Sequence, residues 1–393
     1  MPRWFDRDRG MTQVRVLVVE DSAFMRRRLT SIIESAPGLV VVGIARNGED
    51  AVERVRELQP DVITLDITMP RMDGLTVLIR IMMECPTPTI IVSSLTQDGA
   101  STTLEALELG AVDFVAKPSG TVSLDIDNQR EEIVAKIRGA AGARVGRRRS
   151  SASLRRQAGA IGRAERSRQA GGDDVPSRLV GARRVGARAS SPTARAATAG
   201  AIVAIGVSTG GPQALLEILP SLPRCLPVPV VIVQHMPPAF TGPFAHRLDA
   251  ASAVSVKEAE HGERLMAGTV YVGPGGYQMT VVKSVTGGAP RIRLSHRPRG
   301  LVFCPSVDVL FDSVAWLYGR SAVGVLLTGL GDDGADGMVA IRRAGGATIA
   351  ESDETAVVFG MPRVAIERGG ADVVAPVYQV ADRILDALRE KTR

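Results

Sequence analysis

Short runs of aliphatic and β-branched residues alternate along the chain with segments in which apolar residues recur every three or four positions. The first pattern is typical of buried strands and the second of helices with one apolar face. In the first third of the chain the predicted strands are residues 14–19, 40–44, 62–65, 89–92 and 114–116. The helix predicted after the first strand has its apolar residues on one side, namely Met25, Leu29, Ile32 and Ile33. Five buried strands separated by helices predict an α/β fold, a doubly wound, flavodoxin-like parallel sheet covered on both faces.

The same alternation returns near residue 200. The clearest strands there are predicted at residues 201–207, 230–233 and 323–327, and a helical run follows the first of them at 213–219. Shorter runs between these strands have the character of antiparallel strands, at residues 269–272, 278–282 and 291–294. The pattern predicts a second α/β unit, a three-layer α/β/α doubly wound domain.

Residues 140–199 separate these two regions. They are mostly Ala, Gly, Ser and Arg, without a sustained run of large apolar residues. Such a segment cannot bury enough apolar surface to offset the cost of ordering its backbone. We therefore predict three parts: a first domain at residues 12–139, a flexible linker at 140–199 and a second domain at 200–393.

The positive charge of the chain belongs to this linker. The linker holds 14 arginines and no lysine against three acidic residues, a balance of +11, so the rest of the chain carries −5 of the net +6. Aromatic residues, on which bases stack, make up only 4% of the chain. The folded parts are therefore not expected to bind nucleic acid.

The compartment is indicated by the cysteines and by the hydropathy. Three scattered cysteines match neither a disulfide framework nor a zinc site, which favours a reducing cytoplasm. The first ten residues are charged, and no apolar run approaches the roughly 18 residues of a membrane span. We expect neither a transmembrane segment nor an export signal.

Polar residues follow four strands of the first predicted sheet. Glu20 and Asp21 follow the first strand, Asp66 ends the third, Ser93 ends the fourth and Lys117 ends the fifth. In an open parallel sheet, ligands bind beyond the carboxyl ends of the strands. Carboxylates at one edge suit Mg²⁺, and a lysine and a hydroxyl beside them suit phosphate oxygens. Each residue alone has a plain structural explanation as a helix cap or a turn, but together they predict transfer of a phosphoryl group onto Asp66.

With these residues in place, residues 14–139 resemble a response-regulator receiver domain. The resemblance implies that Asp66 accepts phosphate from a histidine kinase, and that Asp21, Asp66 and the backbone carbonyl of Thr68 hold Mg²⁺. Glu20 stands where many receivers have Asp, and it belongs to the same expected metal site. The resemblance also implies a switch hydroxyl at Ser93, a mobile aromatic at Phe114 and a phosphate-sensing cation at Lys117.

The segment Gly206-Val207-Ser208-Thr209-Gly210 has the G-x-S-x-G pattern between a predicted strand and a helix. Small neighbours permit a sharp turn that exposes the oxygen of a nucleophilic serine. Backbone N–H groups at the helix start, at Thr209, Gly210 and Gly211, are then candidates to stabilise an oxyanion. A Gly-rich phosphate-binding loop has the same order of strand, glycines and helix, so this motif alone leaves both interpretations open.

A nucleophilic serine needs a base and an orienting acid. The chain has four histidines, and His235 is the one that directly follows a predicted apolar strand. The loop Thr328-Gly329-Leu330-Gly331-Asp332-Asp333 follows another strand and brings acids to the same edge. The chain order Ser, His, Asp differs from the Ser, Asp, His of α/β-hydrolases, which disfavours that fold.

A receiver followed by IGVSTGG, VQHMP and LTGLGDDGA resembles the chemotaxis CheB family of protein-glutamate methylesterases and glutamine deamidases. The resemblance implies that Ser208 is the nucleophile, His235 the base and Asp333, rather than Asp332, the orienting acid. Leu330 replaces a methionine often found in that loop, so only a backbone role, in support of the oxyanion and its loop, carries over to it.

The implied substrates are glutamyl methyl esters and glutamines of methyl-accepting chemotaxis receptors, and the implied kinase is of the CheA type. Mg²⁺ is expected in the receiver and no cofactor in the esterase, and the receiver is expected to cover the active site until it is phosphorylated. The competing class is a phosphorylation-controlled binding protein without catalysis, or one that binds nucleic acid through its basic segment. It would lack a member of the triad or carry a basic helix-turn-helix after the linker, and the sequence has neither feature.

Overall fold

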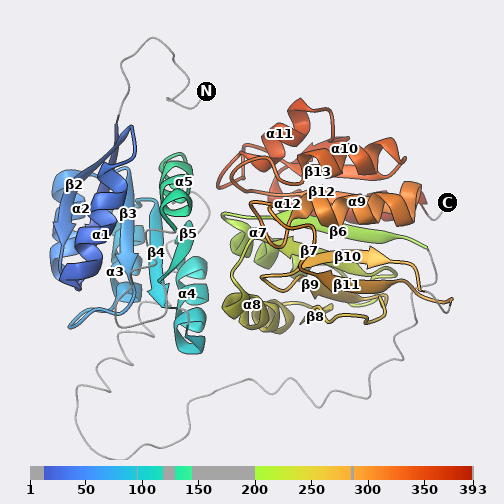
Figure 1. The fold of residues 1–393 in the computed structure, drawn as a ribbon, viewed down its shortest axis with the longest axis horizontal. Coiled ribbons are helices and arrows are strands. Elements are labelled where there is room, and N and C mark those ends of the chain that lie inside the picture. The colour runs from blue at the N-terminus through green and yellow to red at the C-terminus, as the bar shows by residue number, and fades with distance from the viewer. Residues whose placement is uncertain (1–12, 95, 118–128, 144–199, 285–286, 392–393) are drawn as a thin grey trace, which may run out of the picture.

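The computed structural model describes residues 13–94, 96–117, 129–143, 200–284 and 287–391 (Figure 1). Residues 144–199, which make up most of the predicted linker, lie outside this description. No helix in the described part of the chain is both long and apolar enough to cross a membrane.

The first domain is a five-stranded parallel sheet, as the sequence predicts, and its strand order is β2-β1-β3-β4-β5. Its strands are β1 (Val14–Val19), β2 (Leu39–Ala45), β3 (Val62–Asp66), β4 (Thr89–Ser94) and β5 (Asp113–Lys117). Its helices are α1 (Ala23–Glu34), α2 (Gly48–Leu58), α3 (Gly74–Glu84), α4 (Gln97–Leu109) and α5 (Arg130–Ala141).

Local sequence explains where these helices begin and which side they bury. The side chains of Ser22, Asn47 and Asp73 accept hydrogen bonds from backbone N–H groups in the first turns of α1, α2 and α3. These caps satisfy donors that have no partner within the helix. The four apolar residues predicted to face the core from α1 are all buried.

The second domain is a seven-stranded sheet in the order β14-β13-β12-β6-β7-β9-β8, in which every pairing is parallel. Its strands are β6 (Ile202–Val207), β7 (Val230–Gln234), β8 (Ser255–Glu258), β9 (Thr269–Val272), β12 (Ala322–Leu326), β13 (Ala347–Glu351) and β14 (Val373–Ala375). Its helices are α7 (Gly211–Ile218), α8 (Pro238–Ala251), α9 (Val307–Tyr318), α10 (Ala335–Arg343), α11 (Met361–Glu367) and α12 (Val377–Lys391), with short 3-10 turns η2 (Leu219–Ser221) and η3 (Gly319–Ser321).

The central strand β6 shows how the three layers form. Successive side chains of a strand point to opposite faces of the sheet. Ile202 and Ala204 pack in one apolar cluster with α9, α10 and α11. Val203 and Ile205 pack in another cluster with α7, α8 and α12.

The antiparallel character predicted for the short strands is correct for one pair and wrong for β9. Strands β10 (Gln278–Val282) and β11 (Arg291–Ser295) form an antiparallel hairpin. Strand β9 instead runs parallel to both β7 and β8. Helix α8 returns the chain across the sheet between β7 and β8, and residues 259–268 return it again between β8 and β9, so both strands start from the same edge. A run of four residues contains no signal for that direction.

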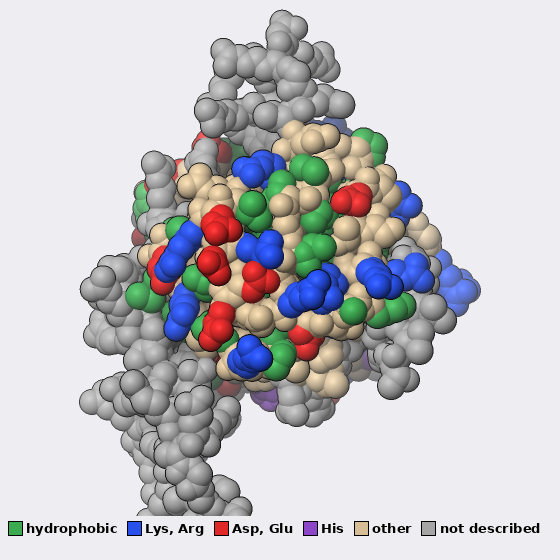
Figure 2. All heavy atoms as spheres, turned by 90° about the vertical axis from the view of Figure 1, so that its left-hand side faces the viewer, with side chains coloured by type: hydrophobic (Ala, Val, Ile, Leu, Met, Phe, Trp, Pro, Cys, Tyr) green, Lys and Arg blue, Asp and Glu red, His purple; other side chains and the backbone are tan. Residues whose placement is uncertain are grey.

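The two domains contact each other along the α4, β5 and α5 side of the first sheet, which faces α7 and α8 in Figure 1. Arg247 of α8 forms an ion pair with Glu108 of α4. The side chain of Gln213 donates to the carbonyls of Leu107 and Ala111 at 2.7 and 3.0 Å. The outward face of the first domain carries intermingled acidic and basic side chains, as is typical of a solvated surface (Figure 2).

Candidate active site

Ser208 lies at the turn between β6 and α7. Its backbone N–H donates to the carbonyl of Thr328, and the N–H of Gly211 donates back to the Ser208 carbonyl at 2.8 Å. Gly210 has a φ of 80°, and a Cβ there would lie 2.6 Å from the side chain of Val357. The turn therefore requires glycine, both for its left-handed backbone and for space. The N–H of Gly211 closes the turn, so Gly211 supports the loop.

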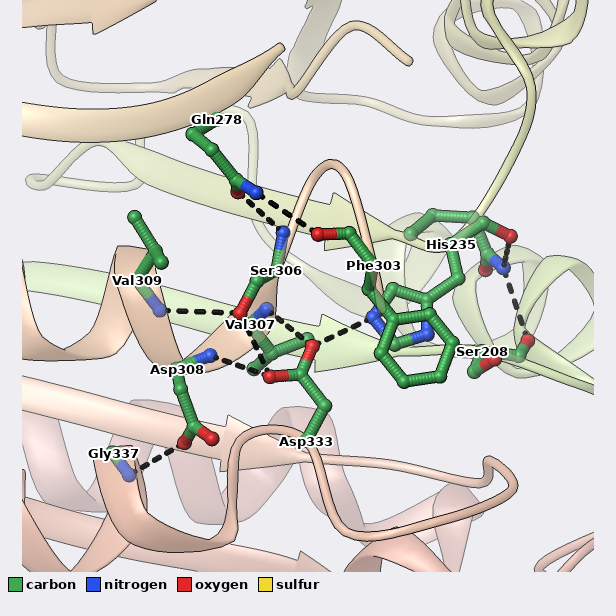
Figure 3. A network of polar contacts seen from close by, with 11 residues as sticks. Ser208, His235, Gln278, Phe303, Ser306, Val307, Asp308, Val309, Asp333 and Gly337 are labelled. Carbon is green, nitrogen blue, oxygen red and sulfur yellow. Dashed lines mark hydrogen bonds and ion pairs between the residues drawn. The ribbon is translucent and has the colours of Figure 1, made fainter. Parts of the chain in front are cut away.

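His235 follows β7 and faces Asp333. Its Nε2 lies 2.8 Å from Oδ2 of Asp333, while its Nδ1 is buried without a hydrogen-bond partner among the described residues. Figure 3 shows this second nitrogen on the side of the ring toward Ser208. A carboxylate accepts only, so Nε2 carries the proton and Nδ1 keeps a free lone pair. His235 therefore has the tautomer of a base directed toward Ser208.

Asp333 is held by the start of α9. Its carboxylate accepts from the Ser306 hydroxyl at 2.8 Å and from the N–H groups of Val307 and Asp308 at 2.7 and 3.1 Å. Burial raises the pKa of Asp333, but the hydrogen bond from His235 and the two backbone donors outweigh burial and hold the pKa below its usual value. Asp333 is thus an ionised acid in a fixed position.

The neighbouring Asp332 has different surroundings. Its side chain is exposed and forms an ion pair with Arg368 at 2.7 Å. Of the two adjacent acids, the structure brings only Asp333 to His235. The remaining histidines lie elsewhere: His246 is in α8, Nδ1 of His261 contacts the backbone of Leu294, and Nδ1 of His296 contacts the carbonyl of Gly276.

Three further side chains shape this site and were not found from the sequence. Gln234 is buried and donates from Nε2 to the carbonyls of both Ser208 and His235, at 3.0 and 3.1 Å. Phe303 stacks on the His235 ring, with centroids 4.0 Å apart and planes 6° from parallel. Gln278 links the Phe303 carbonyl and the Ser306 N–H through its amide. Gln234 precedes His235 in the motif and could have been suspected; Phe303 and Gln278 reach the site through contacts distant in sequence.

Thr209 and Leu330, two residues expected beside the oxyanion, also face the first domain. The Thr209 hydroxyl donates to the carboxylate of Asp113 at the start of β5. Leu330 packs in an apolar cluster with residues of α5; a Cβ at Gly139 would lie 3.3 Å from the Leu330 side chain. Ser208 is only 9% exposed in this arrangement.

At the carboxyl edge of the first sheet, Lys117 lies between two acids. Its Nζ is 2.8 Å from Asp66 and 3.0 Å from Glu20. Burial, and after it the charge of Asp66, raise the pKa of Glu20 to about 7. Glu20, Asp66 and the exposed Asp21 each offer a carboxylate oxygen, and these oxygens lie within 4.8 Å of one another. This all-oxygen set suits Mg²⁺.

Of the other residues predicted for this edge, Thr68 contacts the cluster, Ser93 lies near the end of β4, and Phe114 lies nearer the amino end of β5 and packs against the second domain. The N–H of Thr68 donates to Asp66 at 3.1 Å. Ser93 is buried, with its hydroxyl 3.4 Å from the carbonyl of Gly99. Phe114 is also buried, and its ring lies 4.4 Å from the ring of Phe240 in α8.

Comparisons with known proteins agree with both halves of this arrangement. The sequence profile of the CheB methylesterase family matches residues 203–384, and that of the response regulator receiver domain matches residues 16–126. The chain is 48% identical over 380 residues to protein-glutamate methylesterase/protein-glutamine glutaminase 2 of Carboxydothermus hydrogenoformans, covering 96% of this chain and 100% of that protein. It is 47% identical over 382 residues to the protein-glutamate methylesterase/protein-glutamine glutaminase of Caldanaerobacter subterraneus subsp. tengcongensis, covering 97% of this chain and 98% of that protein. The crystal structure of the Thermotoga maritima CheB methylesterase catalytic domain covers 48% of this chain and 98% of its own, at 43% identity and a TM-score of 0.46.

Proposed function

The chain belongs to the CheB methylesterase family, and we propose that Ser208, His235 and Asp333 are the catalytic residues of its hydrolase activity. That activity is the hydrolysis of glutamate methyl esters and the deamidation of glutamines in chemotaxis receptors. The orientation of the His235 ring supports this assignment. Nε2 forms a hydrogen bond with Asp333, while Nδ1 has no partner among the described residues and lies on the side toward Ser208.

In the first half-reaction, Ser208 transfers its hydroxyl proton to Nδ1 of His235 while its oxygen attacks the carbonyl carbon of the ester. Asp333 keeps the proton on Nε2 and stabilises the imidazolium that forms. The carbonyl oxygen becomes an oxyanion, for which the N–H groups of Thr209, Gly210 and Leu330 are the proposed donors. When the intermediate collapses, the C–O bond to the methoxy group breaks, and that group takes the proton from His235 and leaves as methanol.

In the second half-reaction, water gives a proton to Nδ1 of His235 and attacks the acyl carbon. The bond to Ser208 then breaks, and its oxygen recovers the proton from His235. The product is a glutamate side chain. A glutamine follows the same course, except that the protonated amine leaves as ammonia in place of methanol.

The experiment that tests this assignment measures methanol released from a methyl-esterified receptor fragment, with and without a phosphodonor. We expect release from the wild-type protein and none above background from Ser208→Ala. Hydrolysis by folded Ser208→Ala at the wild-type rate would contradict the serine mechanism. The hydrogen bond between Ser208 and His235 is expected to form with substrate, since such bonds are often long before substrate binds.

The receiver half supplies control. Its presence implies a kinase partner, which we propose to be a CheA-type histidine kinase that phosphorylates Asp66. Glu20, Asp21 and Asp66, with the carbonyl of Thr68, would hold Mg²⁺, which neutralises charge on phosphoryl oxygens when bound. Lys117 already contacts Asp66, and it is placed to pair with the added phosphate.

We further propose that this reaction takes place in the cytoplasm, on the methyl-accepting receptors, and that residues 140–199 join the two domains at 12–139 and 200–393. The matched ranges 16–126 and 203–384 fall within those domains, which supports the division. The direct contact of Thr209 with Asp113 supports control of the site by the receiver. Phosphorylation at Asp66 would act through Ser93 and Phe114 to weaken the contact between domains.

A further inference from the structure

Residues 297–302 form an exposed arch beside the catalytic residues. The arch begins after β11, where Nδ1 of His296 contacts the Gly276 carbonyl at 3.1 Å and the His296 ring stacks on Tyr277 at 4.4 Å. It ends at Phe303, whose carbonyl accepts from Gln278 at 2.9 Å. Both ends of the arch are therefore held by three consecutive residues, Gly276, Tyr277 and Gln278.

The far end of the arch adjoins the catalytic base. Phe303, the residue after the arch, stacks on the His235 ring. Val302, the residue before it, is 90% exposed, and Leu301 is 46% exposed. These exposures hold with the receiver in contact with the catalytic domain, so the receiver leaves the arch uncovered. Two large apolar side chains exposed together at an active site are typical of a binding surface.

The charge of the arch is of one sign. Between residues 291 and 306 the sequence contains four arginines and no acidic residue. Arg297 and Arg299 are exposed, and neither forms an ion pair with another residue in the ranges that the structure describes. A protein segment with carboxylates and an apolar face would therefore meet positive charge and exposed apolar side chains at the arch.

We propose that this arch docks a glutamate-rich segment of the substrate protein, a proposal that rests on the function proposed above. Hydrolysis turns neutral esters and amides into carboxylates, so a segment with several modifiable glutamates carries negative charge beside the reacting side chain. Arg297 and Arg299 pair with those carboxylates, while Leu301 and Val302 contact the apolar side of the same segment. Because the arch is uncovered, docking does not require the receiver to leave, and phosphorylation then controls turnover of a substrate that is already bound.

The test compares kinetic constants on a soluble, methyl-esterified fragment of a receptor's cytoplasmic region. For the double variant Arg297→Glu/Arg299→Glu we expect KM to rise about tenfold, with the effect carried by KM and not by kcat. The matched control is Arg320→Glu/Arg343→Glu, which makes the same charge change at two exposed positions. Arg320 precedes β12 and Arg343 ends α10, so both lie near the amino ends of strands, at the edge of the sheet opposite the triad. We expect the control to keep the wild-type KM. Circular dichroism verifies that each variant is folded.

A second variant tests the apolar part. For Leu301→Ser/Val302→Ser we expect KM for the same fragment to rise about threefold, and KM should still depend on salt concentration as in wild type. In the arginine variant, by contrast, KM should no longer depend on salt concentration. If wild-type protein releases no methanol from the fragment, the proposed function fails. If wild-type protein is active and the arginine variant keeps a KM within twofold of the control, docking at the arch is wrong. If the variant instead loses binding only to phosphatidylglycerol vesicles, the arch binds lipid and the proposal is also overturned.

Discussion

The hydroxyl of Thr209 donates a hydrogen bond to the carboxylate of Asp113, which joins the residue after the proposed nucleophile to the first residue of strand β5 in the receiver. The same carboxylate contacts Nζ of Lys136, which also donates to the carbonyl of Phe114 at 2.5 Å. Lys117, which contacts Asp66, ends the same strand. A shift of β5 on phosphorylation would therefore reach the turn at Ser208 through one strand.

If this interface restrains the enzyme, weakening it should raise activity without phosphate. The ion pair between Arg247 and Glu108 joins α8 to α4 and is partly buried. We expect Arg247→Ala to raise the unphosphorylated rate of methanol release about fivefold, because a partly buried ion pair is worth about 1 kcal/mol. The matched control is Arg363→Ala, which breaks an exposed pair with Glu367 outside the interface. Equal rates for the two variants would show that the interface does not limit activity.

Substitution of the proposed nucleophile or the proposed base should remove catalysis and spare the receiver. We expect Ser208→Ala and His235→Ala each to lower kcat by at least ~1,000-fold, because the members of such a triad act as a unit. Phosphorylation of Asp66, followed with a small-molecule phosphodonor, should stay at the wild-type level in both variants. A variant that loses both properties has lost its fold, and its kinetics would then carry no information about mechanism.

The two adjacent acids should differ sharply. Asp333→Asn places an amide donor against the protonated Nε2 of His235 and favours the wrong tautomer, so we expect a loss in kcat of roughly 10³- to 10⁴-fold. Asp332→Asn removes only an exposed contact with Arg368 and should stay within a factor of two of wild type. The reverse ranking in the same methanol assay would assign the orienting role to Asp332.

Much of this arrangement could be predicted from the sequence, because the sheets are parallel. Strands buried on both faces read as aliphatic runs, and in such sheets the polar residues that follow the runs meet at one edge. That reasoning alone places His235 near the loop of Asp333, which is what the structure shows. The direction of β9 could not be predicted in this way, since it depends on how residues 259–268 return the chain after β8.

The finer geometry could not be predicted, for a different reason. The start of α9 holds Asp333 in place, and this position decides which nitrogen of His235 faces the acid. Asp333 lies about 100 residues after His235 in the sequence. Phe303 and Gln278 reach the site from the hairpin and its following loop, where no periodicity marks them. Such contacts depend on packing between segments that are distant in the sequence, so a local pattern of apolar and polar residues does not predict them.

The last prediction concerns Asp308, which lies beside Asp333 at the start of α9. Its carboxylate accepts from the N–H of Gly337 at 2.7 Å. Burial raises the pKa of Asp308 to about 6, with the charge of Asp333 adding to the rise and the hydrogen bond from Gly337 opposing it. The folded state therefore holds this proton more tightly than the unfolded state, in which an aspartate has a pKa of about 3.9. Its contribution to the free energy of unfolding is complete below about pH 4 and is lost as pH rises toward 6.

Replacing Asp308 by asparagine keeps an acceptor for Gly337 and removes the charge. We expect Asp308→Asn to be more stable than wild type above pH 6, and its free energy of unfolding to fall less between pH 4 and 6. Unfolding in urea is followed by far-ultraviolet circular dichroism at each pH. The exposed Asp382→Asn in α12 is the matched control and should follow the wild-type curve. If the free energies of unfolding of Asp308→Asn and wild type change in parallel between pH 4 and 6, the pKa of Asp308 is not raised in the folded protein.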